Sequence, residues 1–346
     1  MEKVNKQALK FGIFIGLIAL GIGAMVIGSK NTLVNVFVLV LGFALLIKGA
    51  DYFVDGASGI ADKFGIPQIV IGLTIVAFGT SAPEAAVSIS SALKGSTGLA
   101  VGNVLGSNIL NILLILGITS CITTIKVGKN TVYYEMPFVI FITVVLVLMG
   151  KFNGKIDFKC GAILWVFFIF FFIYLIFTAK KGMGEQGAGE DAKGAAEKKN
   201  PMALLILFSI CGVVAIVVGS DITVDSATLI AQKFGMSDRL IGLTIVAFGT
   251  SLPELVTSAI AATKKKADIA IGNVVGSNIF NVLFVLGTTA LIETVNYEAA
   301  FIKDGMIAIA AAVLLFVCCV RKKQLGRIGG IVMLLGYAAY FVYLIR

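Results

Sequence analysis

Residues 71–84 read IGLTIVAFGTSAPE, and residues 241–254 read IGLTIVAFGTSLPE. A second pair of similar peptides follows, GNVLGSNILN at residues 102–111 and GNVVGSNIFN at residues 272–281, at the same offset of 170 residues. Each copy of the first peptide carries one glutamate, Glu84 or Glu254, in an apolar run. An ionisable side chain inside a bilayer costs about 2.5–3.5 kcal/mol on insertion scales. A chain that accepts this cost at two equivalent positions is expected to use both carboxylates together.

The composition is that of an integral membrane protein. The 346 residues are 58% hydrophobic, with a mean hydropathy of +1.02 and 14% charged residues, whereas soluble domains carry about 25% charged residues. Because a spanning helix needs about 20 apolar residues, the sequence predicts an all-α fold in the cell membrane. Eleven spans are predicted, at residues 11–28, 32–48, 68–93, 99–122, 132–150, 160–179, 202–220, 240–262, 268–292, 301–320 and 328–345.

The first span has two interpretations. Lys3, Lys6 and Lys10 precede its apolar run, as in a cleaved signal peptide. A retained transmembrane helix is favoured because no A-x-A cleavage pattern is evident near Gly28. The second half of the chain has no counterpart of this segment, so it is expected to be peripheral to the core.

The distribution of charge predicts the orientation in the membrane. The net charge is +9, and 19 of the 28 Lys and Arg residues lie in loops on one side if the N-terminus is cytoplasmic. Such an excess marks the cytoplasmic side. The charges are therefore explained by the membrane, and no nucleic-acid partner is expected.

The duplication predicts two inverted repeats. Asp51 and Asp55 match Asp221 and Asp225 at the same offset, and the duplicated spans are five helices apart, so they point oppositely through the bilayer. Inverted repeats are typical of secondary transporters. A duplicated packing motif would explain the small residues but not the two glutamates. The expected division is 1–31, an N-terminal cytoplasmic segment with the extra helix; 32–179, the first repeat with its motif at 71–117; 180–200, a flexible cytoplasmic linker; and 201–346, the second repeat with its motif at 241–287.

The motifs present oxygen atoms on one helix face. Residues at i, i+3, i+4 and i+7 share a face, which collects hydroxyls and a carboxylate in each copy. Pro83 cannot donate a hydrogen bond to the carbonyl of Gly79, so a broken helix with free carbonyls near Ala77 is expected. Oxygen ligands suit Ca²⁺, and Mg²⁺ less because it dehydrates reluctantly. The chain has no His, so a transition-metal site is not expected.

These motifs resemble the two α-repeats of sodium/calcium exchangers in the cation/calcium antiporter superfamily, over residues 32–346. The resemblance implies a ten-helix core of two inverted five-helix repeats that binds Na⁺ and Ca²⁺ in turn at a central site. It implies potassium independence as well, because Asn281 stands where the potassium-dependent branch has Asp. The implied metal ligands are Ala77 and Ala247 (both by carbonyls), Thr80, Ser81, Glu84, Ser107, Asn111, Thr250, Ser251, Glu254, Ser277 and Asn281.

Three functions are compatible with this pattern. The first is a Na⁺-driven Ca²⁺ antiporter, and the second is a Ca²⁺/H⁺ antiporter that uses the same two glutamates. A cation channel is third, because broken helices in inverted repeats fit alternating access better than a pore. An enzyme is not expected, since the chain has neither a Ser-His-Asp set nor a nucleotide loop. No cofactor and no obligate protein partner are expected; Ca²⁺, Na⁺ and the lipid bilayer are the expected partners.

Overall fold

The computed structural model describes residues 2–27, 32–66, 68–93, 97–186, 201–233 and 247–345. Within them, eight helices are long and apolar enough to cross a membrane, or nine if the bent pair Ile69–Thr80 and Ala82–Ile89 forms one span. The chain is therefore a nearly all-helical, multi-pass membrane protein, as predicted. Helix occurs at every predicted span, although the first is a shorter apolar helix, Lys10–Ala24, and the eighth is described only from residue 247.

The first half contains the N-terminal helix α1, the long helix α2, a broken helix and three further helical spans. Its elements are α1 (Glu2–Ile27), α2 (Thr32–Phe64), α3 (Gln68–Ile71), the π-helix η1 (Gly72–Val76), α4 (Ala77–Thr80), α5 (Ala82–Leu93), α6 (Thr97–Leu110), η2 (Asn111–Ile115), α7 (Leu116–Ile122), β1 (Ile125–Lys126), η3 (Thr131–Glu135), α8 (Met136–Asn153), β2 (Lys155–Ile156) and α9 (Phe158–Gln186). Most of the predicted linker, residues 187–200, lies outside the described residues.

The described part of the second half follows the order of the first from α2 onward. Its elements are α10 (Met202–Lys233), α12 (Ala247–Thr250), α13 (Leu252–Thr263), α14 (Ala267–Phe280), the π-helix η5 (Asn281–Leu286), α15 (Gly287–Ile292), β3 (Val295–Asn296), α16 (Ala299–Val320), β4 (Gln324–Leu325) and α17 (Arg327–Ile345). Residues 234–246, which include the counterpart of η1, lie outside the described residues.

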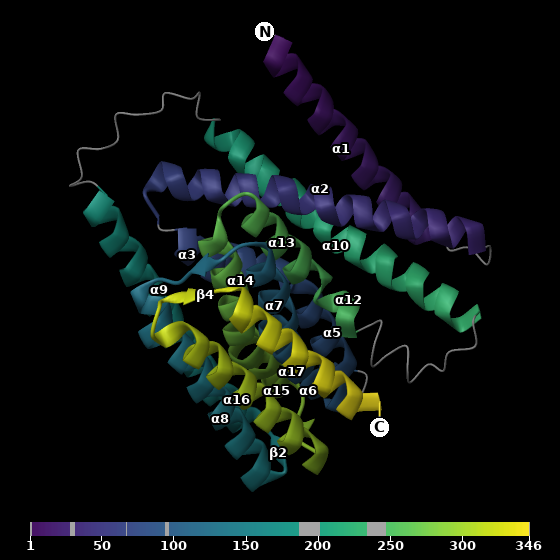
Figure 1. Ribbon diagram of the computed structural model, residues 1–346. Coiled ribbons are helices and arrows are strands. Elements are labelled where there is room, and N and C mark those ends of the chain that lie inside the picture. The colour runs from purple at the N-terminus through teal and green to yellow at the C-terminus, as the bar shows by residue number, and fades with distance from the viewer. Residues whose placement is uncertain are drawn as a thin grey trace.

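Helices α2 and α10 lie side by side across the remaining bundle, and α1 packs against them (Figure 1). Aromatic rings join the three helices: Phe14 stacks on Tyr52 with ring centroids 4.4 Å apart, and Phe208 lies 5.0 Å from the same tyrosine. The predicted extra helix thus packs outside the duplicated core, against its two longest described helices.

Two short strand pairs reveal the inverted topology. β1 pairs with β4, and β2 pairs with β3, both antiparallel. In the duplication β1 corresponds to β3, and β2 to β4. Because β1 precedes α8 and β2 follows it, the two strands lie at opposite ends of that span, and β3 lies beside β2. Corresponding loops of the two halves therefore lie at opposite ends of the bundle.

Two glycines allow the halves to cross closely at the centre. A Cβ atom on Gly72 would lie 2.8 Å from the carbonyl oxygen of Ile269 and 3.0 Å from Cα of Gly272. A Cβ atom on Gly272 would lie 2.7 Å from the carbonyl oxygen of Ile69. Helix α14 is consequently deeply buried: every residue from Ile269 to Phe280 is buried. Small residues permit this approach between membrane helices.

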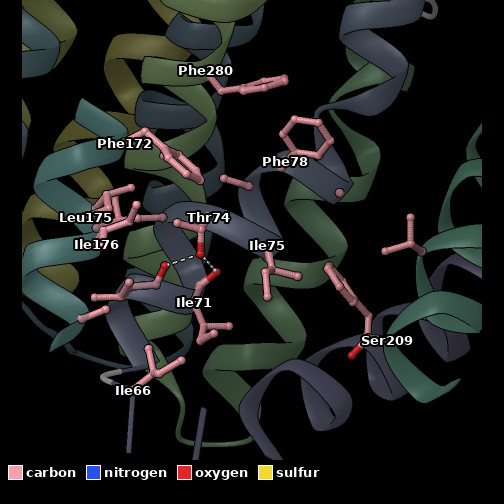
Figure 2. Close-up of a pocket in the computed structure, with 18 of the residues that line it drawn as sticks. Ile66, Ile71, Thr74, Ile75, Phe78, Phe172, Leu175, Ile176, Ser209 and Phe280 are labelled. Carbon is pink, nitrogen blue, oxygen red and sulfur yellow. Dashed lines mark hydrogen bonds between the residues drawn. The ribbon is translucent and has the colours of Figure 1, made fainter. Parts of the chain in front are cut away.

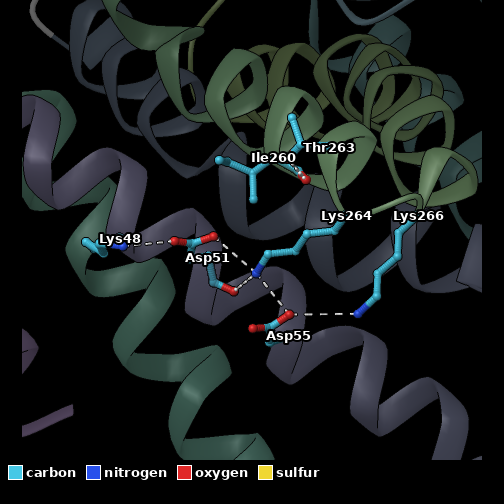
Figure 3. Close-up of polar contacts among 7 residues, drawn as sticks. All are labelled: Lys48, Asp51, Asp55, Ile260, Thr263, Lys264 and Lys266. Carbon is cyan, nitrogen blue, oxygen red and sulfur yellow. Dashed lines mark hydrogen bonds and ion pairs between the residues drawn. The ribbon is translucent and has the colours of Figure 1, made fainter. Parts of the chain in front are cut away.

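An ion-pair cluster joins α2 to the turn between α13 and α14 (Figure 3). The Nζ atom of Lys264 lies 3.1 Å from Oδ1 of Asp51 and 2.9 Å from Oδ1 of Asp55, and it donates to the backbone carbonyl of Asp51 at 2.9 Å. Lys48 and Lys266 add longer contacts of 3.3 and 3.8 Å to Asp51 and Asp55. The cluster connects the middle of α2 to this turn.

Candidate functional site

Each duplicated peptide contains a helix break at a serine. Helix α4 ends at Thr80 and α5 begins at Ala82, with Ser81 at φ −85°, ψ 9°, and the two segments are bent by 48°. Ser251 separates α12 from α13 with nearly the same angles, −91° and 4°. Pro83 and Pro253 follow in the first turn of the new helices. A backbone N–H at this position would have no intrahelical acceptor, so proline costs no hydrogen bond there. The predicted broken helix is therefore present.

The breaks place both glutamates at helix N-termini. Glu84 lies in the first turn of α5 and Glu254 in the first turn of α13, and both side chains are fully buried. The N-terminal end of a helix dipole favours negative charge. This placement offsets part of the cost of burying two carboxylates.

Each carboxylate is held by a serine from the other half. Ser81 Oγ donates to Oε1 of Glu254 at 2.7 Å, and Ser251 Oγ lies 3.2 Å from Oε1 of Glu84. Ser277 Oγ adds a second contact of 3.3 Å to Glu254 Oε1, and Ser107 Oγ lies 3.1 Å from Ser251 Oγ. The predicted hydroxyl ligands of both halves thus meet around the two carboxylates.

Four asparagines cross-link the halves beside the glutamates. Asn108 and Asn278 donate to each other's backbone carbonyls at 3.1 and 3.2 Å. Asn111 donates to Oδ1 of Asn278 at 3.0 Å, and Asn281 donates to Oδ1 of Asn108 at 3.1 Å. Asn111 and Asn281 begin the π-helical turns η2 and η5, and such turns are frequent at functional sites.

Four buried oxygen atoms in this cluster accept no hydrogen bond from the part of the chain that the structure describes. They are Oε2 of Glu84, Oε2 of Glu254, Oδ1 of Asn111 and Oδ1 of Asn281. All four are acceptors on predicted ligands, and a buried acceptor without a partner is costly. A bound cation would satisfy oxygen atoms of this kind, whereas an anion would not.

The structure brings the predicted site residues together, with one difference. The sequence predicts free carbonyls near Ala77, whereas the Ala77 carbonyl itself accepts the Ser81 N–H at 3.0 Å; its role as an ion ligand, which would use its second lone pair, stays a prediction. The bend occurs at Ser81, so the hydrogen bond that ends α4 is retained. Ala247 begins the corresponding helix α12. Thr80, Ser81, Glu84, Ser107, Asn111, Thr250, Ser251, Glu254, Ser277 and Asn281 are all buried.

Several polar residues of the cluster were missed in the sequence. Asn103 and Asn273, like Asn108 and Asn278, belong to the second duplicated peptide, and their common offset of 170 residues was the available signal. Outside the contacts described above, Glu135, near the start of the predicted span 132–150, was also not singled out in the sequence, yet it is only 2% exposed and accepts a 3.0 Å hydrogen bond from the Tyr174 hydroxyl. Within the described ranges, no group of three or more His, Cys, Asp or Glu gathers as a metal cluster.

A large cavity in the bundle, lined mainly by apolar side chains, borders this cluster at Ala77. It has a volume of about 770 Å³, and Phe78, Phe172 and Phe280 contribute to its lining (Figure 2). Its hydroxyls already serve their own helices: Thr74 donates to the Val70 carbonyl at 2.6 Å, and Ser209 to the Leu205 carbonyl at 3.0 Å. The cavity therefore lacks the oxygen ligands of a cation site.

Comparison with known proteins agrees with these features. The family model "Sodium/calcium exchanger protein" matches residues 34–177 and 204–346. The sodium/calcium exchanger MaX1 of Methanosarcina acetivorans is 32% identical over 90% of this chain and 98% of its own length. The inner membrane protein YrbG of Escherichia coli is 34% identical over 88% of this chain and 95% of its length. The Ca²⁺/H⁺ antiporter ChaA of Bacillus subtilis is 25% identical, over 94% and 96%.

A solved structure shares the fold. The sodium-calcium exchanger NCX_Mj, in a crystal soaked with zero Na⁺ and Ca²⁺, superposes with a TM-score of 0.78 and 31% sequence identity. The match covers 91% of this chain and all of the other chain. The likeness therefore extends over both repeats and beyond the duplicated peptides.

Proposed function

The chain belongs to the sodium/calcium exchanger protein family, and we propose that it is a secondary active antiporter that exchanges Ca²⁺ for Na⁺ by alternating access. The observation that carries this proposal is the pair of buried glutamates. Each gives one oxygen to a serine of the other half and leaves the second oxygen without a donor. The proposed ligands are the twelve residues of the sequence prediction.

Competition for one set of oxygens supplies the exchange. Two carboxylates balance the charge of one Ca²⁺, which prefers six to eight oxygen ligands at about 2.3–2.6 Å. Several Na⁺ ions can use the same carboxylates, hydroxyls and amides. Because the ligands are shared, binding of one cation excludes the other. The serine hydroxyls donate to Oε1 of each glutamate, and we expect them to turn their lone pairs toward a bound cation.

The two-fold relation of the halves supports alternating access. When a site is built equally from two inverted repeats, the repeats can exchange conformations. The site then opens to one side of the membrane or to the other. In this proposal residues 32–179 and 201–346 are the transport repeats, 180–200 is a cytoplasmic linker, and 1–31 adds a peripheral helix. We propose that the chain has no enzymatic activity and needs no cofactor.

A Ca²⁺/H⁺ antiporter is the second candidate. Two points favour it: the likeness to ChaA, and the ability of the Glu84 and Glu254 carboxylates to bind a proton in place of a metal ion. The deciding experiment is ⁴⁵Ca²⁺ uptake into proteoliposomes with a Na⁺ gradient or a pH gradient imposed separately. Uptake driven by the outward Na⁺ gradient at equal pH is expected. Uptake that follows only the pH gradient would replace the first candidate with the second.

A further inference from the structure

Asn103 and Asn273 each bind the glutamate-bearing helix of their own repeat. The Nδ2 atom of Asn273 donates to Ser258 Oγ at 3.0 Å and to the Glu254 carbonyl at 3.4 Å. The Nδ2 atom of Asn103 donates to Ser88 Oγ at 3.0 Å and to the Glu84 carbonyl at 3.3 Å. The amide donors are therefore used within one repeat, beside its glutamate.

The carbonyl end of each amide reaches the other repeat. Oδ1 of Asn273 accepts the Thr80 hydroxyl at 3.0 Å, and Oδ1 of Asn103 accepts the Thr250 hydroxyl at 3.3 Å. Both threonines are proposed ion ligands. Each asparagine is thus a bridge from a threonine of one repeat to the glutamate helix of the other.

The direction of this hydrogen bond decides what the threonine offers to an ion. A hydroxyl has one proton and two acceptor lone pairs. Thr80 has two other acceptors within reach, the carbonyls of Val76 at 3.1 Å and Ala77 at 3.4 Å. When the proton goes to Asn273, the hydroxyl lone pairs and the second lone pair of the Ala77 carbonyl both remain available to a cation.

We propose that Asn103 and Asn273 are positioning residues, each of which fixes a threonine ligand of the opposite repeat against its own glutamate helix. This inference rests on the proposed ion site and adds a role that the duplicated motif alone does not assign. It makes the ligand set a single unit across the two repeats. A simpler role, in which the asparagines only join neighbouring helices through Ser88 and Ser258, makes a different prediction.

The test is a set of double-mutant cycles on Ca²⁺ affinity, measured by ⁴⁵Ca²⁺ equilibrium binding to the purified full chain. Four single variants, Asn273→Leu, Thr80→Val, Asn103→Leu and Thr250→Val, are each expected to raise the Kd about tenfold, because each removes or misplaces one ligand hydroxyl. The matched double variants are Asn273→Leu with Thr80→Val and Asn103→Leu with Thr250→Val. Because the effects of contacting residues are coupled, each matched double should have about the same Kd as its single variants.

The pseudo-symmetry supplies matched controls. The crossed doubles, Asn273→Leu with Thr250→Val and Asn103→Leu with Thr80→Val, should weaken binding about a hundredfold, because independent effects add in free energy. Equal additivity in matched and crossed doubles would overturn the proposal.

A further variant covers the case in which the leucine variants do not fold. Ser258→Ala removes the Ser258 contact of Asn273 but keeps its hydrogen bond to the Glu254 carbonyl of the glutamate helix and its acceptor for Thr80. Its Kd should stay within about twofold of the unmutated chain, by the same additivity rule. A tenfold loss in Ser258→Ala would show that the asparagine only joins helices, and would contradict the proposed role.

The binding assay separates this inference from the proposed function. Normal coupling with no Na⁺-driven transport would refute the proposed function alone. Normal transport with additive binding would refute the inference alone, and absence of Ca²⁺ binding in the unmutated chain would refute both.

Discussion

The Ser81 hydroxyl lies 2.7 Å from Oε1 of Glu254, so a serine of the first repeat donates a hydrogen bond to the carboxylate of the second. The reciprocal contact, Ser251 to Glu84, is 3.2 Å long. Neither half contains a complete carboxylate site, because each glutamate depends on a donor from the other half. Any motion that separates the breaks at these two serines would therefore change both carboxylates at once.

The charge of each glutamate should be essential for exchange. Glu84→Gln and Glu254→Gln keep the volume and the oxygen that accepts the serine proton, but they remove the negative charge. We expect the affinity for Ca²⁺ to fall about a hundredfold, since loss of one partner of a buried charge pair costs about 2–5 kcal/mol. Ca²⁺ flux in proteoliposomes measures this, with the exposed Glu293→Gln as control. Near-normal flux in either variant would sink the site assignment.

A third carboxylate at Asn281 should impair exchange. Asn281 donates to Oδ1 of Asn108 at 3.1 Å, so Asn281→Asp would replace this hydrogen bond with repulsion between two oxygens and add an uncompensated buried charge. We expect Ca²⁺ uptake into Na⁺-loaded vesicles to decrease in the variant. In the unmutated chain, uptake should be unchanged when choline replaces K⁺. A strict K⁺ requirement there contradicts the interpretation of Asn281.

The close crossing at Gly72 should tolerate no side chain. In Gly72→Ala the new methyl group would lie 2.8 Å from the Ile269 carbonyl oxygen, and overpacking of this kind costs about 1–3 kcal/mol. We expect a lower melting temperature in detergent. Gly106→Ala is the control, because nothing lies within 4 Å of its Cβ position. Equal melting temperatures for the two variants would argue against the crossing.

The ion-pair cluster of Lys264 with Asp51 and Asp55 should make a small, salt-dependent contribution to thermal stability. Lys264→Ala leaves Asp51 and Asp55 without their shortest cationic contacts, and partly exposed pairs contribute about 0–1 kcal/mol each. We expect a modest loss of thermal stability at low salt that disappears near 1 M NaCl, where screening acts within about 3 Å. Lys265→Ala, an exposed neighbour in the same turn, should have no effect. A loss that persists at high salt would exclude an electrostatic origin.

The membrane orientation can be tested by cysteine labelling. The strand pairs collect charged loops at one end: the Val127 N–H donates to the Lys323 carbonyl at 2.8 Å, which brings the loops of Lys126 and Lys323 together, as a common cytoplasmic side requires. In a background without the five native cysteines, Lys155→Cys should react with an impermeant maleimide outside intact cells. Lys265→Cys and Lys193→Cys should react only after permeabilisation. Labelling of Lys193→Cys from outside intact cells would show the opposite orientation to the predicted one.

The spans and the break were predictable because they depend on local sequence. Apolar runs of about 20 residues give the helices, and the offset of 170 residues identifies the two copies of the site. The break lies at Ser81, two residues before Pro83, because Ser81 adopts non-helical backbone angles. The Ala77 carbonyl therefore keeps its backbone partner.

The contacts between the halves could not be derived in the same way. Whether Ser81 approaches Glu254, or its own Glu84, depends on how two bundles dock, and no local period encodes that. The buried state of Glu135 has the same origin: it occupies a span end in sequence, and only the packing of α9 brings the Tyr174 hydroxyl to it.

The reciprocal serine contacts have a consequence for the biosynthesis of this chain. The donor for Glu84 is Ser251, which is 167 residues later in the sequence. Ribosomes add about 5–20 residues per second, so the first carboxylate is made roughly 8–33 seconds before its partner exists. During that interval a newly inserted first half must hold Glu84 with water, lipid headgroups or the insertion machinery. Completion of the site is therefore a late step of membrane assembly, and truncated chains that end before residue 251 should be recognised as unfinished by quality-control proteases.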